Sequence, residues 1–172
     1  MTEGSSTSEA VAPRWLDQGQ QRAWRAYMVG SILLNDQLDD ELRHEFGIGL
    51  NEYEVLVRLS ERDEHCLRMS ALADAMRFSR SRVTHTIKRM ETAGLVRRSE
   101  ATEDGRGIIA HLTDAGHDLL VRAAPRHVAG VRAHLVDLVS KEDFAAMGRV
   151  FDAVADRLAA AHPGTDLRTS GS

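Results

Sequence analysis

One short segment of the sequence carries side chains suited to binding nucleic acid. Residues 79–90 (SRSRVTHTIKRM) are expected to form a helix after Ser79, whose hydroxyl can accept a hydrogen bond from an amide of the first turn. Hydroxyl, imidazole and cationic groups, which donate hydrogen bonds to base edges and phosphates, gather on one face of this helix. That face would present Ser81, His85, Lys88 and Thr92, flanked by Arg82 and Arg89. The segment is therefore a candidate for contact with nucleic acid.

The opposite face of the same segment is apolar. Val83, Ile87 and Met90 fall on one stripe, which predicts that the helix packs on a core. No acidic residue interrupts the polar face before Glu91. A basic face on a core-packed helix can also be merely solvated, so the flanking segments decide between the two interpretations.

The segments on either side predict a winged helix-turn-helix. A short strand at 67–69 would lead into a helix with Ser70 as its N-cap, and Arg77 and Phe78 would form the turn before residues 79–90. Gly94 is expected to end that helix in the C′ position. Residues 95–98 and 108–112 are then predicted as two strands around a turn at 103–107 (EDGRG).

A long helix is predicted before this module. Residues 16–45 have helical spacing of apolar side chains, with a break expected near Gly30. Gly47 is a candidate left-handed cap, and Asn51 is expected to cap the next helix. A helix of about 30 residues would span about 45 Å. Because this exceeds the core of a small domain, part of it is expected to pack against another subunit.

Two more helices are predicted after the module. Thr113 would cap a helix reaching Leu138, with a kink or break at Pro125. Ser140 would cap the last helix, whose apolar residues repeat at steps of three and four and require a partner helix. This stripe consists of Phe144, Met147, Phe151, Val154 and Leu158.

The predicted fold class is mainly α (α+β). It is a winged helix-turn-helix with a small β-hairpin wing, flanked by N- and C-terminal dimerisation helices. We divide the chain into a disordered tail (1–13), an N-terminal dimerisation helix region (14–49), a winged helix-turn-helix DNA-binding domain (50–112), C-terminal dimerisation helices (113–162) and a second disordered tail (163–172).

Charge is distributed unevenly along the chain. The formal net charge is −4, yet residues 68–106 hold nine Arg or Lys against five Asp or Glu. Residues 36–64 hold ten acidic residues and three Arg. A basic block in an acidic chain is typical of a docking surface for a polyanion.

The sequence favours a cytoplasmic protein without catalytic chemistry. Cys66 is the single cysteine, which excludes an intrachain disulfide and suits a reducing compartment. No segment approaches the ~20 apolar residues of a membrane helix, so we expect a soluble chain with no membrane partner. No nucleophile elbow, phosphate-binding glycine loop or metal-ligand spacing is present, so we expect no enzyme, no catalytic residue, no metal and no cofactor.

Several segments, in order and correctly spaced, resemble the MarR family of bacterial transcription regulators. The resemblance covers the chain from about Trp24 to Leu158. It rests on 50–56 (LNEYEVL), 69–73 (MSALA), 79–84 (SRSRVT), 90–98 (METAGLVRR), 104–106 (DGR) and 112–116 (LTDAG).

The resemblance implies a homodimeric regulator of transcription. Each subunit would place residues 79–90 in a major groove of double-stranded DNA and its wing over the adjacent minor groove. Half-sites about 34 Å apart would make the operator a pseudo-palindrome. Members of the family usually repress genes. Many release DNA when a small organic acid or phenol binds between the dimerisation helices and the DNA-binding domain.

A set of DNA-binding residues follows from the segment and the resemblance together. It comprises Ser79, Ser81, Arg82, Thr84, His85, Lys88, Arg89 and Arg106. Arg106 is expected to enter the minor groove, while Arg97 and Arg98 approach phosphates or lie in solvent. Arg89 could instead pair with Asp104.

Two positions depart from the family pattern. Arg77 stands at the turn where the family often has glycine, so that helix end is expected to be capped differently. Gly105 replaces an arginine that many members carry at the wing tip, which puts one phosphate contact in doubt.

Trp24 and His44 are the candidates for a ligand site between the first helices and the DNA-binding domain. Met28 and Tyr53 are expected in the core instead. A zinc-responsive regulator that uses His44 with His111 or His117 is one alternative. Another is a protein-interaction module on a winged-helix scaffold, which the acidic block at 36–64 would suit. Cys66 is not expected to sense peroxide, because few basic groups lie near it.

Overall fold

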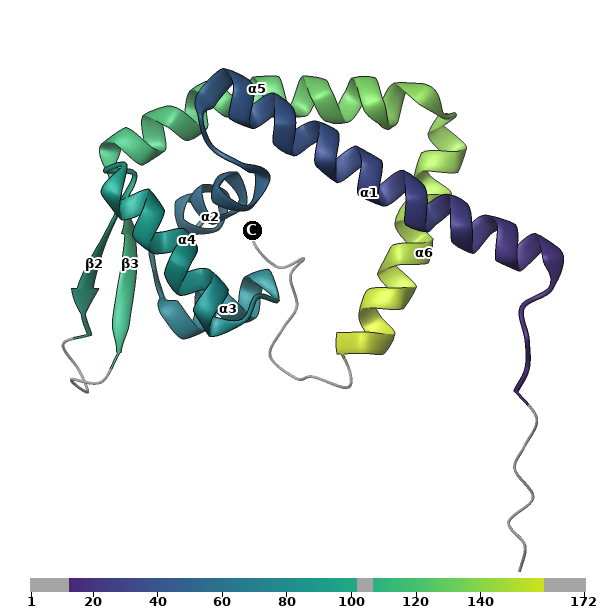
Figure 1. Cartoon of the computed structure of the whole chain (residues 1–172), viewed down its shortest axis with the longest axis horizontal. Helices are drawn as coiled ribbons and strands as arrows, with labels where there is room; N and C mark the ends of the chain where they lie inside the picture. Colours follow the sequence, from purple (N-terminus) through teal and green to yellow (C-terminus); the bar gives the residue numbers. More distant parts are fainter. Residues whose placement is uncertain (1–12, 102–106, 160–172) are drawn as a thin grey trace, which may run out of the picture. The chain divides into compact units, whose positions relative to one another are not determined.

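The structure, a computed structural model, describes residues 13–101 and 107–159, and it confirms the mainly helical fold class (Figure 1). The chain divides into two compact units, Met1–Leu33 and Leu34–Ser172, and the first helix continues through the boundary. The helices are α1 (Gln18–Phe46), α2 (Leu50–Ser60), α3 (Met69–Met76), α4 (Arg80–Thr92), α5 (Asp114–His134) and α6 (Lys141–Ala159), with a 3-10 turn η1 (Val136–Leu138) before α6. The strands are β1 (Cys66–Arg68), β2 (Val96–Glu100) and β3 (Ile108–Leu112).

The core of the second unit lies between the helix-turn-helix and the helices around it. Leu42 of α1, Leu56 and Leu59 of α2 and Leu72 of α3 are fully buried there. The predicted inner stripe of α4 is confirmed, because Val83, Ile87 and Met90 join the same cluster. Burying side chains of this size contributes about 1.5–3 kcal/mol each. The core therefore fixes α4 by one face and leaves its other face to solvent.

The three strands form one antiparallel sheet in the order β1-β3-β2. In the hairpin, Val96 pairs with Leu112 and Glu100 with Ile108, so the predicted returning strand is confirmed. On the other side, Cys66 pairs with His111. The wing tip, including Asp104, Gly105 and Arg106, lies outside the described residues.

Four of the predicted helix signals are confirmed by hydrogen bonds or backbone angles. The Thr113 hydroxyl accepts from the Gly116 amide at 3.1 Å, and the Ser140 hydroxyl accepts from the Asp143 amide at 3.0 Å. Gly47 and Gly94 both have positive φ, at 71° and 73°. After Gly94 the Leu95 amide donates to the Met90 carbonyl, which closes the end of α4.

Two predicted caps are wrong by two residues each, because the N-caps are Gly49 and Arg68. Asn51 lies inside α2, which begins after Gly49, and the Gly49 amide donates to the Glu52 carboxylate at 2.7 Å. Ser70 lies inside α3, which begins at Met69 directly after β1. In both cases the preceding residues adopt an extended conformation set by the fold rather than by a serine or asparagine side chain.

No helix ends at Gly30 or at Pro125, and the alternative of a kink at Pro125 stays a prediction. α1 is continuous through Gly30, and α5 continues through Pro125 to His134. Proline at that position removes one amide donor without ending the helix. The segment predicted as the end of this helix is instead η1, which reaches Leu138.

Gly116 lets the start of α5 approach the wing. A Cβ atom at this position would lie 2.1 Å from the Leu95 carbonyl oxygen. The Thr113 hydroxyl donates to the Gly94 carbonyl at 2.7 Å, so the same turn of α5 is bonded to the end of α4. A residue without a side chain is therefore required at Gly116.

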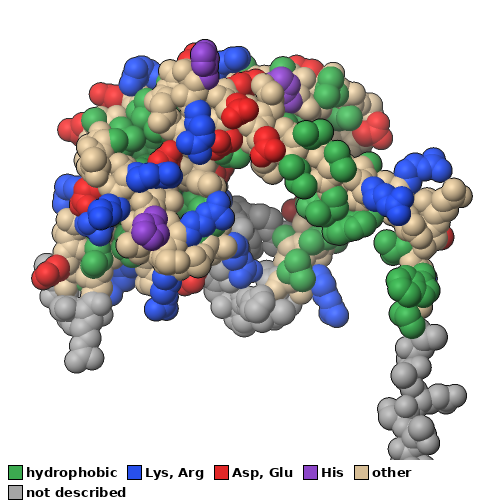
Figure 2. Space-filling model, viewed as in Figure 1, with side chains coloured by type: hydrophobic (Ala, Val, Ile, Leu, Met, Phe, Trp, Pro, Cys, Tyr) green, Lys and Arg blue, Asp and Glu red, His purple; other side chains and the backbone are tan. Residues whose placement is uncertain are grey.

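Both the first half of α1 and α6 expose hydrophobic side chains in the single chain (Figure 2). Those of α1 are Trp24, Tyr27, Met28, Val29, Ile32 and Leu33, and those of α6 are Phe144, Val150, Phe151, Val154 and Leu158. Every helix within the described ranges is too short or too polar to span a lipid bilayer. The predicted domain boundaries stay a prediction, and most of both predicted tails lies outside the described ranges.

Candidate nucleic-acid interface

The outer face of α4 is exposed along its whole length. The predicted contact residues on this helix all lie at the surface: Ser79, Ser81, Arg82, Thr84, His85, Lys88 and Arg89. Figure 2 shows Lys and Arg side chains gathered over the helix-turn-helix part of the molecule. Ser79 is the N-cap, as predicted, and its hydroxyl accepts from the Arg82 amide at 3.2 Å. The hydroxyls of Ser79 and Ser81 lie 3.1 Å apart.

The hydroxyl groups of α4 differ in how free they are to bind DNA. Thr84 donates to the Arg80 carbonyl at 2.8 Å, and Thr92 donates to the Lys88 carbonyl at 3.0 Å. Their donor hydrogens are therefore used within the helix. Within the described ranges, the Ser81 hydroxyl is bonded only to the Ser79 side chain, so it can exchange that bond for a phosphate oxygen more readily than Thr84 can.

The turn before α4 forms around Arg77 in a left-handed conformation, with φ 55° and ψ 32°. The Phe78 amide donates to the Ala73 carbonyl at 3.1 Å, and the Arg77 amide donates to Asp74 at 3.2 Å. These two bonds are the usual closure of a helix end by glycine. The expectation that Arg77 would change the capping is therefore wrong: the arginine adopts the backbone that glycine normally supplies.

Arg82 is held by an aromatic ring. Its guanidinium carbon lies 3.8 Å from the centroid of Phe78, and that ring packs partly buried against the core. A guanidinium over an aromatic face is attracted by the partially negative face of the ring, which arises from its quadrupole. The stack therefore restrains the orientation of Arg82 while leaving N–H groups at its edge.

Arg89 forms an ion pair with Glu52 of α2. The distance from Arg89 Nη2 to Glu52 Oε1 is 3.0 Å, although the arginine side chain stays largely exposed. Asp104, the alternative partner predicted from the sequence, lies outside the described residues. Sequence reasoning did not predict the contact with Glu52, because the two residues come from separate helices.

Arg98 is bound to the end of α4 rather than free in solvent. Its Nη2 lies 2.6 Å from Glu91 Oε2, and its backbone amide donates to the same carboxylate at 3.2 Å. The hydrogen bond from Arg98 lowers the pKa of Glu91 below its usual value. This pair therefore braces β2 against α4. Arg97 is exposed, and Arg106 lies outside the described ranges.

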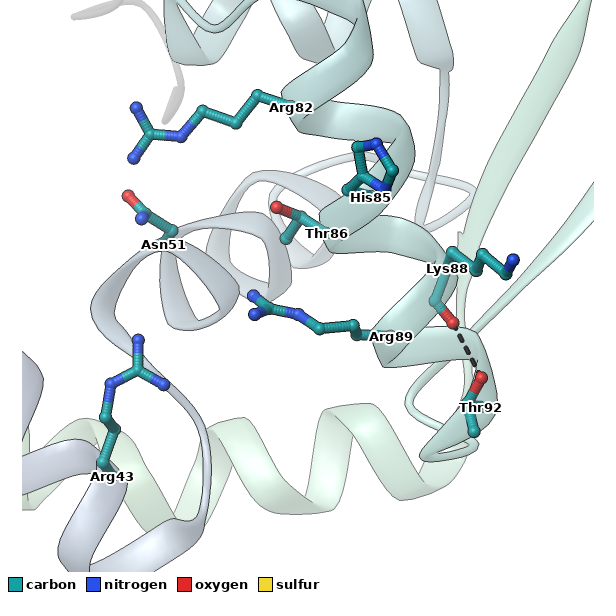
Figure 3. Close-up of a pocket in the computed structure, with 8 residues that line it drawn as sticks. All are labelled: Arg43, Asn51, Arg82, His85, Thr86, Lys88, Arg89 and Thr92. Carbon is teal, nitrogen blue, oxygen red and sulfur yellow. Dashed lines mark hydrogen bonds between the residues drawn. The ribbon is translucent and has the colours of Figure 1, made fainter.

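A groove of about 680 Å³ lies along α4 where it faces α2 and the end of α1 (Figure 3). It is lined by Arg43, Asn51, Arg82, His85, Thr86, Lys88, Arg89 and Thr92. Figure 3 shows the side chains of Arg82 and Arg89 pointing from α4 toward the side on which Asn51 and Arg43 lie. Sequence reasoning missed Arg43 and Asn51, because helical spacing alone cannot bring α1 and α2 next to α4.

Asp39 holds Arg43 at the edge of this groove. The Arg43 Nε lies 2.5 Å from Asp39 Oδ2, and the other carboxylate oxygen accepts from the Leu50 amide at 2.7 Å. Burial alone would raise the pKa of Asp39, but these hydrogen bonds lower it below its usual value. The Asp39 carboxylate therefore stays ionised and orients Arg43 next to the start of α2.

The two predicted ligand-binding residues lie in different compact units. Trp24 is in the first, where its ring centroid lies 5.7 Å from that of Tyr27, and 54% of its surface is exposed. His44 is exposed in the last turn of α1. Neither lines the groove along α4. Tyr53 is buried, as expected, whereas Met28 is exposed in the single chain, contrary to expectation.

The surroundings of His111 and Cys66 do not favour metal binding or oxidation. His111 Nε2 lies 2.8 Å from the Ser99 hydroxyl, and burial lowers the pKa of this histidine. Within the described part of the chain, no three His, Cys, Asp or Glu side chains are grouped to hold a metal ion. Burial and the nearby Glu64 raise the pKa of the Cys66 thiol, which makes a thiolate less accessible.

Comparisons with known proteins agree with this arrangement. Residues 48–108 match the sequence model of the MarR family. The chain is similar to AbsC, a MarR family transcriptional regulator from Streptomyces coelicolor, with 42% identity and a TM-score of 0.79 over 85% of this chain and 98% of AbsC. It is also similar to Sco3205, a MarR family transcriptional regulator from the same organism in complex with DNA. That likeness has 37% identity and a TM-score of 0.83, over 92% of this chain and 98% of Sco3205.

Two curated regulators are more distant. The HTH-type transcriptional regulator PecS from Dickeya dadantii is 29% identical over 122 residues, which cover 69% of this chain and 74% of PecS. The HTH-type transcriptional regulator PapX from Escherichia coli is 34% identical over 71 residues. This chain spans 43% of PapX, less than half of that relative.

The family model, the two Streptomyces regulators and the arrangement of α2 to β3 all indicate the same assignment. The resemblance found in the sequence is confirmed, since both solved regulators exceed 30% identity and are matched over nearly their whole length. The chain belongs to the MarR family of transcriptional regulators.

Proposed function

We propose that this protein is a homodimeric repressor that acts in the cytoplasm and binds a pseudo-palindromic operator in double-stranded DNA. A small organic acid or phenol would release it. Proteins of this family regulate transcription and are not enzymes. Three features of the chain support the proposal: the exposed face of α4, the apolar surfaces of α1 and α6, and the cationic groove.

The observation that carries DNA binding is the exposed face of α4. Ser81, His85 and Lys88 project from a helix whose other face is fixed in the core. A helix of this kind fits the major groove and reads base edges with its first turns. Sco3205, at 37% identity, was determined in complex with DNA, which supports the same role here.

Fluorescence anisotropy with a duplex that the wild-type protein selects from a random library tests this role. Lys88→Ala is expected to weaken binding by about 1–3 kcal/mol, because it removes a cation from the DNA face. Arg122→Ala removes an exposed cation from α5 instead and should leave affinity within about twofold. Equal losses for both variants would contradict the assignment of α4 as the reading helix.

The proposed dimer rests on the exposed apolar residues of α1 and α6. Phe144, Phe151, Val154 and Leu158 recur at helical spacing on α6, and each is more than a third exposed. An apolar stripe of this length is stabilised by a partner helix. A two-fold dimer would also set two copies of α4 at the spacing that a pseudo-palindrome requires.

Analytical ultracentrifugation tests the dimer. The wild-type protein should sediment as a dimer at micromolar concentration, and Phe151→Arg should shift it toward monomer by placing a charge in the apolar stripe. Arg149→Glu alters charge on another side of the same helix and should leave the dimer intact. A wild-type monomer at all concentrations would overturn this part of the proposal.

The cationic groove supports the response to an effector. Its volume of about 680 Å³ suits a small molecule, and four of its eight lining residues are Arg or Lys. Arg43 and Arg89 are paired with Asp39 and Glu52, but Arg82 and Lys88 have no acidic partner within 4.0 Å among the described residues. An anionic ligand would therefore be attracted to a surface that also carries DNA-contact residues.

Calorimetry with benzoate and with phenol as separate probes tests the effector site. We expect benzoate to bind and Arg43→Ala to weaken it about tenfold, which corresponds to about 1.4 kcal/mol. Trp24→Ala and His44→Ala test the residues chosen from the sequence in the same experiment. Loss of benzoate binding in those variants, with none in Arg43→Ala, would move the site away from the groove.

A further inference from the structure

We propose that Phe78 is a positioning residue that holds Arg82 ready for a phosphate of the DNA backbone. The inference rests on the proposed function, because it concerns how α4 engages DNA. Phe78 itself lies in the turn before α4 and is partly buried, so it acts through Arg82 rather than by touching DNA.

Hydrogen bonds hold the backbone of both stacked residues, Phe78 and Arg82. The Phe78 ring packs against the core, and its amide donates to the Ala73 carbonyl at 3.1 Å. The Arg82 amide donates to the Ser79 hydroxyl at 3.2 Å. The guanidinium carbon then lies 3.8 Å from the ring centroid. The arginine is thus anchored at its backbone and at its charged end.

The stack on Phe78 leaves the positive charge of Arg82 available for a phosphate, because the ring holds the guanidinium without neutralising it. Among the described residues, no carboxylate lies within 4.0 Å of Arg82, so the positive charge remains available. A flexible arginine loses rotamer freedom when it binds, and a stack that already restricts the side chain reduces that loss. The N–H groups at the guanidinium edge can still form paired hydrogen bonds with phosphate oxygens.

The position of Arg82 around the helix favours a phosphate over a base. At 100° per residue, Arg82 lies about 90° from the centre of the face formed by Ser81, His85 and Lys88. Figure 3 shows its side chain extending sideways, toward the side of Asn51. When the centre of a helix face meets base pairs in a major groove, its flanks face the sugar-phosphate walls.

A double-mutant cycle in DNA affinity tests the inference. The proteins are the wild type, Phe78→Leu, Arg82→Ala and the double variant, each measured by anisotropy on the selected operator and on a random duplex. Phe78→Leu is expected to weaken binding to both duplexes about threefold to tenfold, because the stacked arginine loses its support. In the Arg82→Ala background the same change should have an effect below about 1.5-fold.

Two conservative variants separate positioning from a general structural role. Phe78→Tyr keeps the aromatic face and should bind DNA within about twofold of the wild type. Arg82→Lys keeps the charge at an exposed position but cannot stack as a plane, and it should lose about as much affinity as Phe78→Leu. This second variant does not depend on whether Phe78→Leu folds. Arg82→Ala should also reduce the salt dependence of binding by about one phosphate contact.

Several outcomes would overturn the inference. One is an equal effect of Phe78→Leu with and without Arg82, which would mean that the ring acts only on the fold. Another is loss of operator binding alone with random-duplex binding unchanged, which would mean that Arg82 reads a base. A wild-type protein that binds no duplex contradicts the proposed function as well, whereas binding without coupling in the cycle contradicts this inference alone.

Discussion

Glu52 of α2 and Arg89 of α4 form an ion pair, in which Oε1 lies 3.0 Å from Nη2. The pair joins α4, the proposed recognition helix, to α2. The other Glu52 oxygen accepts a buried hydrogen bond from the Gly49 amide at 2.7 Å. One buried carboxylate therefore both binds the amide at the start of α2 and pairs with an arginine of α4. This gives Glu52 a larger structural role than its exposed partner.

The asymmetry of this pair predicts unequal effects of removing its two members. Glu52→Ala leaves the buried Gly49 amide without an acceptor and should lower the free energy of unfolding by about 1–3 kcal/mol. Arg89→Ala removes only the exposed partner and should cost less than about 1 kcal/mol. Urea denaturation at one protein concentration measures both. Equal losses would mean that the Gly49 hydrogen bond contributes nothing.

Arg77 should be replaceable by glycine with a gain in stability. Its backbone is left-handed, with φ 55°, which costs an L-residue roughly 1–2 kcal/mol, and glycine avoids that cost. Because glycine is also more flexible in the unfolded chain, we expect Arg77→Gly to stabilise the protein by about 0.5–1 kcal/mol.

Thermal unfolding measures this change, which corresponds to a rise in the unfolding temperature of about 1–4 °C for a chain of this size. Arg77→Ala serves as the matched control, since it removes the same charge but keeps the Cβ atom. A gain with alanine equal to that with glycine would show that charge, and not backbone conformation, was responsible.

The parts of the fold that sequence reasoning predicted correctly depend on neighbouring residues. Ser79, Thr113 and Ser140 each accept a bond from an amide three residues away, so their roles follow from local sequence. The inner stripe of α4 is equally local, because Val83 and Ile87 are one helical turn apart. Such features are fixed before any tertiary contact is known.

The parts that could not be predicted depend on contacts between distant segments. α2 begins after Gly49 because Glu52 and Asp39 bind the Gly49 and Leu50 amides, so the asparagine at position 51 has no capping role. Arg43 reaches the groove along α4 only once α1 and α2 have packed. The left-handed Arg77 is a further case, since the fold imposes a backbone that its side chain disfavours.

Gly116 should not tolerate even a methyl group. An added Cβ would lie 2.1 Å from the Leu95 carbonyl oxygen, so α5 or the base of the wing would have to shift. We expect Gly116→Ala to lower the free energy of unfolding by about 1–3 kcal/mol. Chemical denaturation followed by circular dichroism measures it.

Gly148 provides the matched control for this change. An added Cβ at Gly148 of α6 meets no atom within 4 Å, and alanine is the better helix former. Gly148→Ala should therefore stabilise the chain by up to about 1 kcal/mol. If both substitutions were neutral, the close approach at Gly116 would be relieved by small movements, and the glycine would not be required.

His127 should make stability depend on pH through its contact with Tyr53. The two ring centroids lie 4.5 Å apart, and the buried His127 Nδ1 has no hydrogen-bond partner within the part of the chain that the structure describes. Burial lowers the pKa of His127 below its ordinary value of 6.5, although the nearby Glu54 and Glu41 oppose that effect. Well above pH 6.5 the residue is almost fully neutral in both the folded and the unfolded chain, so it contributes little pH dependence there.

As the pH falls through that value, the unfolded chain binds a proton that the folded chain resists, so stability declines until the lowered pKa is reached. Unfolding temperatures at pH 7.5 and 5.5 measure this, at values where carboxylates remain largely ionised. His127→Phe keeps a ring against Tyr53 but cannot titrate, so its difference between the two pH values should be smaller than in the wild type. Because burial also lowers the pKa of His111, part of the pH dependence of the unfolding temperature should persist in His127→Phe. If His127→Phe showed the full wild-type difference between pH 7.5 and 5.5, His127 would not contribute to the pH dependence.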